Sequence, residues 1–145
     1  MPVFVDTNVL VYARDLSEGS KHEQALAWLE HLWETRSGRL SYQVLQEYYV
    51  TVTRKLRPGL PPVDARADVR DLLTWRPVMV QADLLETAWR VEARGDVSFW
   101  DALVVAAARS AGCTHLLTED LGEGRRLGGV TVASPFVHEP GSLDC

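Results

Sequence analysis

The sequence contains almost no lysine, very little cysteine and no long hydrophobic run. Lys21 and Lys55 are the only lysines among the 15 basic residues of this 145-residue chain, and the others are arginines. The 20 acidic residues outnumber them and give a net charge of −5, which is not the usual composition of a nucleic-acid binder. No stretch of about 18 consecutive apolar residues is present, so we expect no transmembrane helix and no membrane partner.

Two cysteines, Cys113 and Cys145, are too few for a disulfide framework or a metal-binding motif. We expect Cys113 to be a small buried core residue. The first residues carry no basic leader and reach an acid at Asp6, unlike a secretory signal peptide. These features predict a cytoplasmic protein.

The composition that is present, 46% hydrophobic and 24% charged residues, is typical of a globular domain. We expect one domain over residues 1–137 and a flexible C-terminal tail over residues 138–145. Short apolar runs alternate with longer segments of helical periodicity. The expected strands are residues 3–5, 39–41, 77–80, 115–118 and 130–132. The expected helices are residues 8–14, 20–36, 42–56, 63–75, 82–94 and 98–111.

No two expected strands are joined by a tight hairpin signal, and strands alternate with helices throughout. This order predicts an α/β fold with a mostly parallel sheet covered on both faces. Ser20 and Glu23 have the spacing of a capping box, which predicts the start of the second helix.

Acidic residues stand at the points where the expected strands end. Asp6 follows the first strand, and Glu119 and Asp120 follow the fourth. Asp101 and Glu47 each lie early in a helix whose other residues look like core residues. Because ligands of open α/β sheets bind beyond the carboxyl ends of the strands, we expect these acids to meet at one end of the sheet.

Carboxylates that converge in this way repel one another, and burial makes the cluster still less favourable. A hard divalent cation removes that cost, since Mg²⁺ and Mn²⁺ prefer oxygen ligands. The chemistry that such a site favours is metal-assisted hydrolysis of a phosphate ester.

Each acid also has a simpler interpretation. Asp101 forms a capping-box spacing with Ser98, and Glu47 could be an ordinary solvated helix residue. Glu119 and Asp120 could belong to a turn. The joint placement of all these acids favours a functional site over several independent accidents.

Several segments resemble the motifs of PIN-domain ribonucleases. The segment from Val3 to Leu10 is similar to the opening motif of that family, and Ser98–Leu103 and Leu116–Leu121 are similar to its third and fourth acidic motifs. Glu47 matches the second acid by spacing. Val130–Phe136 is similar to the last strand and its exit, so the resemblance covers nearly the whole chain.

The resemblance implies a three-layer αβα fold around a five-stranded, mostly parallel sheet. It also implies an endoribonuclease that depends on Mg²⁺ or Mn²⁺. Short members of this kind resemble the VapC-type toxins of bacterial toxin–antitoxin pairs, which form homodimers and are inhibited by a cognate antitoxin protein. RNA would be the substrate.

The resemblance also assigns roles to individual residues. The residues that would hold the metal are Asp6, Glu47, Asp101 and Asp120. Thr118 would support the site through its hydroxyl group, and Asn8 would orient Asp6 through its amide. Glu119 is an additional acid beside the motif and a weaker candidate.

The sequence gives weaker evidence for the residues that contact RNA phosphates and for those that form a dimer interface. Arg14, Arg54 and Arg57 follow the segments that carry Asp6 and Glu47, and they could bind RNA or be ordinary solvated charges. Trp28 and Trp33 look exposed and could supply a dimer face.

Two other functions remain open at the sequence level. A phosphatase of the haloacid-dehalogenase type resembles the chain after its first strand, but that class has a second Asp where this chain has Asn8. A response-regulator receiver would need a late lysine, and none follows Lys55. A non-catalytic binding module with the same fold is the second alternative.

Overall fold

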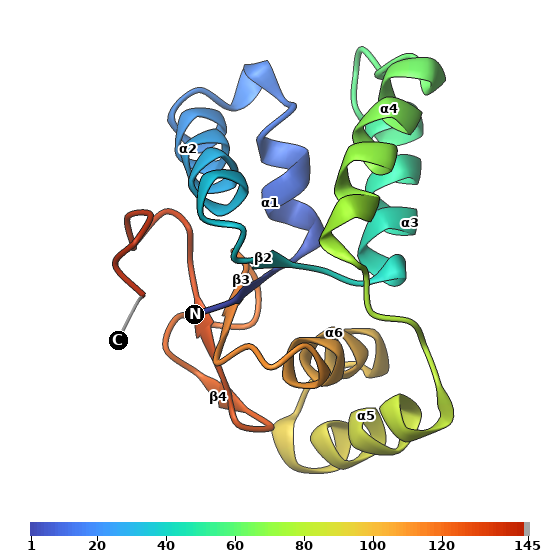
Figure 1. Ribbon diagram of the computed structural model, residues 1–145, viewed down its shortest axis with the longest axis vertical. Coiled ribbons are helices and arrows are strands. Elements are labelled where there is room, and N and C mark those ends of the chain that lie inside the picture. The colour runs from blue at the N-terminus through green and yellow to red at the C-terminus, as the bar shows by residue number, and fades with distance from the viewer. Residues whose placement is uncertain (144–145) are drawn as a thin grey trace.

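The computed structural model describes residues 1–143 and contains one sheet of five short strands flanked by helices (Figure 1). The strands are β1 (Val3–Val5), β2 (Gly38–Arg39), β3 (His115–Leu117), β4 (Arg126–Leu127) and β5 (Val130–Ala133). They are arranged in the order β2-β1-β3-β5-β4, and all neighbours are parallel except β4 and β5. The predicted α/β class with a mostly parallel five-stranded sheet is therefore confirmed.

Six α-helices surround this sheet in the described part of the chain. They are α1 (Thr7–Tyr12), α2 (Ser20–Thr35), α3 (Tyr42–Val50), α4 (Pro62–Leu72), α5 (Ala82–Gly95) and α6 (Phe99–Ser110). The π-helical turn Thr51–Lys55 continues α3. Because β2 and β3 lie on opposite sides of β1, right-handed connections place α1 and α2 on one face and α5 and α6 on the other, as Figure 1 shows. No helix of the described chain is both long and apolar enough to cross a membrane.

The core lies on both faces of the sheet, against α6 on one face and against α1 and α2 on the other. Phe4, Val5, Leu116 and Leu117 have no exposed surface, as expected for parallel strands that are covered on both faces. Every residue of α6 from Ala102 to Ala108 is also buried. The small alanine side chains let this helix approach the sheet closely, which fixes the position of its N-terminus.

Two strand predictions were wrong. Residues 77–80 form no strand, and Val78 makes a single bridge with Ser41, because Pro77 has no backbone N–H to extend the ladder. A hairpin that the sequence analysis excluded joins β4 to β5 through Gly128 and Gly129, both at positive φ. A Gly-Gly pair suits such a turn because glycine adopts positive φ without steric cost.

The capping prediction for α2 was also wrong. Gly19 occupies the N-cap position, Ser20 is already the first helical residue, and no side chain caps this end. Trp28, expected to be exposed, is 1% exposed and donates from Nε1 to the carbonyl oxygens of Pro135 and His138. Leu143 is also buried. Residues 138–143, expected as the start of a tail, therefore contact the core, and residues 144–145 lie outside the described chain.

Candidate active site

A cleft of about 420 Å³ opens at the carboxyl edge of the sheet. It brings together all four acids that the resemblance assigned to the metal, which are Asp6, Glu47, Asp101 and Asp120. Asp6 and Asp120 come from the ends of β1 and β3, and Glu47 and Asp101 come from α3 and α6. The convergence follows from the parallel topology, since both strands end at the same edge.

The cleft contains three further acidic or amide side chains that were not predicted from the sequence, those of Asp15, Glu18 and Gln43. Six carboxylates thus line one cleft, and no lysine, arginine or histidine of the described residues is among its lining residues. Asp15 and Glu18 lie in the polar break directly after α1. Both residues follow Asp6 by one short helix, and this spacing could have predicted that they line the same cleft.

Asp6 is the most buried acid of the cleft, with 8% of its surface exposed. It caps α1, and its Oδ1 accepts from the backbone N–H of Thr7 at 2.8 Å. Its Oδ2 accepts from the hydroxyl group of Thr118 at 3.0 Å. Burial raises the pKa of Asp6 to about 6, these two hydrogen bonds oppose the rise, and the charges of Glu47 and Asp101 add to it. The structure therefore places like charges close to a buried carboxylate.

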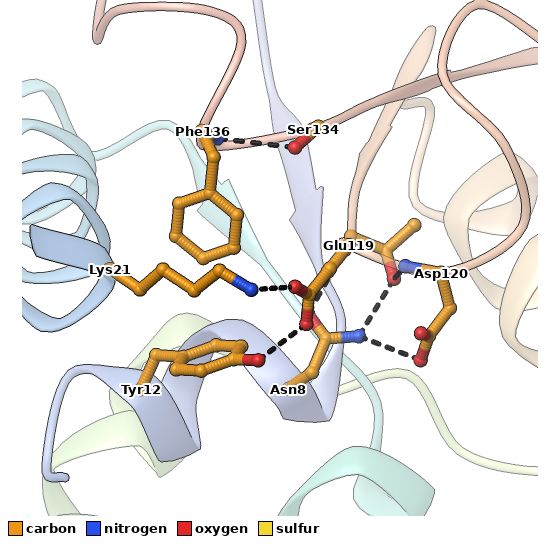
Figure 2. Close-up of polar contacts among 8 residues, drawn as sticks. Asn8, Tyr12, Lys21, Glu119, Asp120, Ser134 and Phe136 are labelled. Carbon is orange, nitrogen blue, oxygen red and sulfur yellow. Dashed lines mark hydrogen bonds and ion pairs between the residues drawn. The ribbon is translucent and has the colours of Figure 1, made fainter. Parts of the chain in front are cut away.

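Asn8 connects the loop after β3 to α1, as Figure 2 shows. Its Nδ2 donates to the hydroxyl oxygen of Thr118 at 2.8 Å and to Asp120 Oδ2 at 3.2 Å. Its Oδ1 accepts from the backbone N–H of Glu119 at 3.1 Å. The amide of Asn8 thus bonds Asp120, rather than Asp6 as expected, and it reaches Asp6 only through Thr118.

Glu47 is exposed but held at both oxygens. Its Oε2 accepts from the hydroxyl group of Thr7 at 2.9 Å, and its Oε1 accepts from Gln43 Nε2 at 3.0 Å. Gln43 is buried, and its own Oε1 has no hydrogen-bond partner in the described chain. A buried, unpaired acceptor in an acidic cleft fits a site that binds a further donor or a cation.

Asp101 lies in the first turn of α6. The hydroxyl group of Ser98 accepts from the backbone N–H of Asp101 at 3.1 Å and caps the helix. The carboxylate of Asp101 makes no hydrogen bond to a described residue and lines the cleft. Ser98 therefore caps α6, and the Asp101 carboxylate is available to bind a ligand.

Glu119 points away from Asp120, toward Tyr12 of α1 and Lys21 of α2 (Figure 2). Its carboxylate forms an ion pair with Lys21 and accepts from the hydroxyl group of Tyr12 at 2.5 Å. Burial acts to raise the pKa of Glu119, but the hydrogen bonds from Lys21 and Tyr12 outweigh it and lower the pKa. Lys21 also lies over the rings of Tyr12 and Phe136. Glu119 therefore anchors the loop that carries Asp120 and does not line the cleft.

The arginines predicted to bind RNA lie outside the cleft. Arg14 makes a two-pronged contact with Asp68, with nitrogen–oxygen distances of 2.7 and 2.8 Å. Arg54 and Arg57 are exposed on and after the π-helical turn that follows α3. None of the three is among the residues that line the acidic cleft.

Substitution of Glu119 separates an anchoring role from metal binding. Glu119→Gln keeps the side-chain shape but loses the ion pair with Lys21. We therefore expect the RNA cleavage that the sequence resemblance implies to fall less than about 10-fold, below the range for groups that orient metal ligands directly. Asp120→Asn should cost more than about 100-fold. Initial cleavage rates of the two variants give the comparison, and equal losses would show that Glu119 acts as a ligand.

The four acids fit a divalent cation by charge and donor type. Within residues 1–143, no three carboxylate, imidazole or thiol side chains are gathered closely enough to hold a metal ion as they stand. The acids of the cleft nevertheless offer only oxygen donors. Among them, the buried carboxylate of Asp6 is repelled by the charges of Glu47 and Asp101. Gln43 adds a buried oxygen without a hydrogen-bond partner among the described residues. Mg²⁺ and Mn²⁺ take this donor set in proteins.

Comparison with known proteins identifies the family. Residues 3–124 match the PIN domain, and the chain belongs to the PIN-domain family. Its solved structural neighbours include VapC toxins of VapBC toxin–antitoxin systems. The sequence-level resemblance to this family is therefore confirmed, and the comparison with phosphatases loses its basis.

Three solved structures illustrate the similarity. VapC20 of Mycobacterium tuberculosis, a toxin that cleaves the sarcin-ricin loop, is 29% identical over 79% of this chain and 86% of its own, with a TM-score of 0.59. A toxin–antitoxin complex from Klebsiella pneumoniae shares 19% identity over 96% and 99% of the two chains, with a TM-score of 0.65. VapBC2 of Rickettsia felis, bound to a promoter DNA fragment, shares 17% identity over 92% and 98%, with a TM-score of 0.59. A search of curated proteins finds no match.

Proposed function

We propose that this protein is an endoribonuclease that depends on Mg²⁺ or Mn²⁺ and acts as the toxin of a toxin–antitoxin pair in the cytoplasm. The observation that carries the proposal is a cleft with six carboxylates and no basic side chain among its described lining residues. Such a cleft repels the phosphates of RNA unless cations are bound. The similarity to a toxin that cleaves the sarcin-ricin loop supports RNA as the substrate class.

Asp6, Asp101 and Asp120 would hold the cation, and Glu47 would bind it or orient the attacking water. When bound by these residues, a divalent cation would supply activation of a water molecule and compensation of the charge that develops on the phosphate oxygens. Thr118 and Thr7 fix the orientation of Asp6 by donating to its two oxygens. Asn8 keeps Asp120 in place, and Thr7 and Gln43 do the same for Glu47.

The proposal is tested by removing the cation. RNA cleavage is measured in Mn²⁺ or Mg²⁺, with and without EDTA, and we expect EDTA to abolish it. In parallel, thermal unfolding is followed without nucleic acid, and Mn²⁺ should raise the melting temperature because it binds the folded state alone. Cleavage that persists in EDTA would contradict metal dependence. RNA binding without cleavage in any metal would instead indicate a non-catalytic binding module.

The proposed toxin function implies two further partners, an antitoxin protein and a second copy of the chain. Co-expression with a small reading frame next to the gene should give a stable complex in which cleavage is inhibited. Light scattering on the purified protein should give twice the chain mass of 16.2 kDa. A monomer of full activity would rule out the homodimer as a requirement.

A further inference from the structure

A second pocket, of about 510 Å³, is lined by four arginines and no acid of the described chain. They are Arg90 and Arg94 of α5, Arg109 of α6 and Arg126 of β4. The tip of the β4–β5 hairpin, at Gly128 and Gly129, forms part of the remaining wall. This concentration of positive charge is unexpected in a chain whose net charge is −5.

The four guanidinium groups have no hydrogen-bond or ion-pair partner among residues 1–143. All four residues are exposed, and in the part of the chain that the structure describes none of them forms an ion pair with a carboxylate. Arg90 and Arg94 are also four residues apart on one helix face, a spacing at which like charges disfavour the helix. The fold thus accepts a repulsive arrangement that a bound anion would relieve.

The pocket lies across the sheet from the acidic cleft. Its lining includes Val130, the first residue of β5, and Cys113, which precedes β3. The acids instead follow the last residues of the parallel strands. A strand such as β5 has four residues and spans about 10 Å at about 3.3 Å per residue. The two sites are therefore separate, and a molecule that occupies both must extend around the domain.

The geometry points to an RNA-binding site at this pocket, in which Arg90, Arg94, Arg109 and Arg126 hold backbone phosphates of the substrate away from the scissile bond. Arginine suits this role because its planar guanidinium donates two parallel hydrogen bonds to one phosphate. The inference rests on the proposed ribonuclease function. It explains how an acidic protein retains a long RNA, since the cleft itself offers no basic side chain among the residues described.

Salt-dependent RNA binding tests this inference. A fluorescein-labelled single-stranded RNA longer than the cleft is titrated with the Asp6→Asn protein, in Mg²⁺, between about 50 and 200 mM KCl. Adding Arg90→Gln and Arg94→Gln should weaken binding about 10-fold and reduce the slope of log K against log salt by about 1.4, near 0.7 for each phosphate that an arginine no longer neutralises. Arg109→Gln with Arg126→Gln should have the same effect from a different helix and strand.

The chain provides a matched control. Arg66 and Arg70 lie four residues apart on α4 and do not line the pocket, so Arg66→Gln with Arg70→Gln makes the same charge change on another helix and should leave the slope within about 0.3 of the parent. If all three double variants showed the same RNA affinity and the same salt slope, the inference would be overturned. The same conclusion follows if inorganic phosphate binds the pocket by calorimetry while RNA affinity is unaffected, since the site then takes a small anion. A parent protein that binds no RNA at all would instead overturn the proposed function.

Discussion

Asp6→Asn is expected to reduce RNA cleavage by more than about 100-fold, since removal of a group that merely orients a metal ligand already costs about 10–100-fold. Asp6 is the acid that the fold fixes most firmly, with hydrogen bonds to both carboxylate oxygens and 8% exposure. An asparagine keeps the shape but supplies a neutral, weaker ligand. Initial rates on a labelled RNA in saturating Mg²⁺ measure the loss, and a rate within about 10-fold of the parent would show that Asp6 does not hold the cation.

The same substitution should make the metal-free protein more stable at pH 8. Asp6 has a pKa of about 6 in the folded protein against 3.8 as its ordinary value. The folded state thus holds the proton more tightly than the unfolded chain, and stability falls as the pH rises from about 4 to about 6. Two pK units correspond to about 3 kcal/mol. Loss of the hydrogen bond from Thr118 costs about 1 kcal/mol of stability. The net gain in the free energy of unfolding is therefore about 2 kcal/mol.

Thermal unfolding between pH 4 and pH 8, in EDTA, checks this sign. The melting temperature of Asp6→Asn should exceed that of the parent by about 4 °C or more at pH 8. This advantage should be gone by about pH 4, where the Asp6 carboxyl of the folded parent is protonated and the lost hydrogen bond outweighs the remaining charge penalty. Asp101→Asn is the matched control, because that carboxylate is only partly buried and its replacement should change the melting temperature less. A constant difference at every pH would mean that the gain comes from packing and not from the buried charge.

The placement of the acids could be predicted because it depends on local order along the chain. An acid that directly follows a buried parallel strand must emerge at the carboxyl edge of the sheet, and this holds for Asp6 and Asp120. Asp101 follows a Ser98 cap at the start of a helix too apolar to lie anywhere but on the sheet. Glu47 lies one turn into α3, which begins just after β2.

Contacts between distant segments were the part that the sequence did not reveal. The ion pair between Lys21 and Glu119 joins α2 to the loop after β3, and neither residue carries a local signal of the other. Gln43 resembles any helix residue until Glu47 and Trp100 are placed around its amide. Arg14 looked like a phosphate ligand for the same reason, because Asp68 on α4 is far from it in sequence.

Short elements were the other source of error. β4 has only two residues, too few to show the alternation by which strands are recognised, so its Gly128-Gly129 turn was overlooked. Pro77 and Val78 have the composition of a strand, but one bridge to Ser41 is all that they form. In both cases pairing depends on a partner segment, and not on the local sequence.

Thr118→Val is the second substitution with a large expected effect. Thr118 is 1% exposed, and its hydroxyl group is fully used: it donates to Asp6 Oδ2 and accepts from Asn8 Nδ2 and from the backbone N–H of Asp120. A hydroxyl group offers one donor and two acceptor positions, so these three bonds saturate it. One buried oxygen therefore links three of the residues that form the cleft.

Valine has nearly the same shape and removes all three hydrogen bonds, although Asn8 keeps its bond to Asp120. An unsatisfied buried polar group costs about 1–3 kcal/mol, and because Asn8 and Asp120 are less buried, we expect a loss of about 2–3 kcal/mol in the free energy of unfolding. RNA cleavage should fall about 10–100-fold, the range for groups that orient metal ligands. Without the Thr118 donor the pKa of metal-free Asp6 rises further. Protons then compete better with the cation, so at a fixed, subsaturating Mg²⁺ concentration the pH at which cleavage reaches half its maximum should move upward.

Thr118→Ser is the matched control, because it removes one methyl group and keeps the hydroxyl. If the hydrogen bonds of Thr118 cause the loss of activity, Thr118→Ser should retain most of the activity and the parent pH profile, whereas Thr118→Val should retain neither. Urea unfolding, initial cleavage rates and the pH profile are measured on both variants. Equal defects in the two would assign the effect to packing at this position, since the hydroxyl group is the property that distinguishes them.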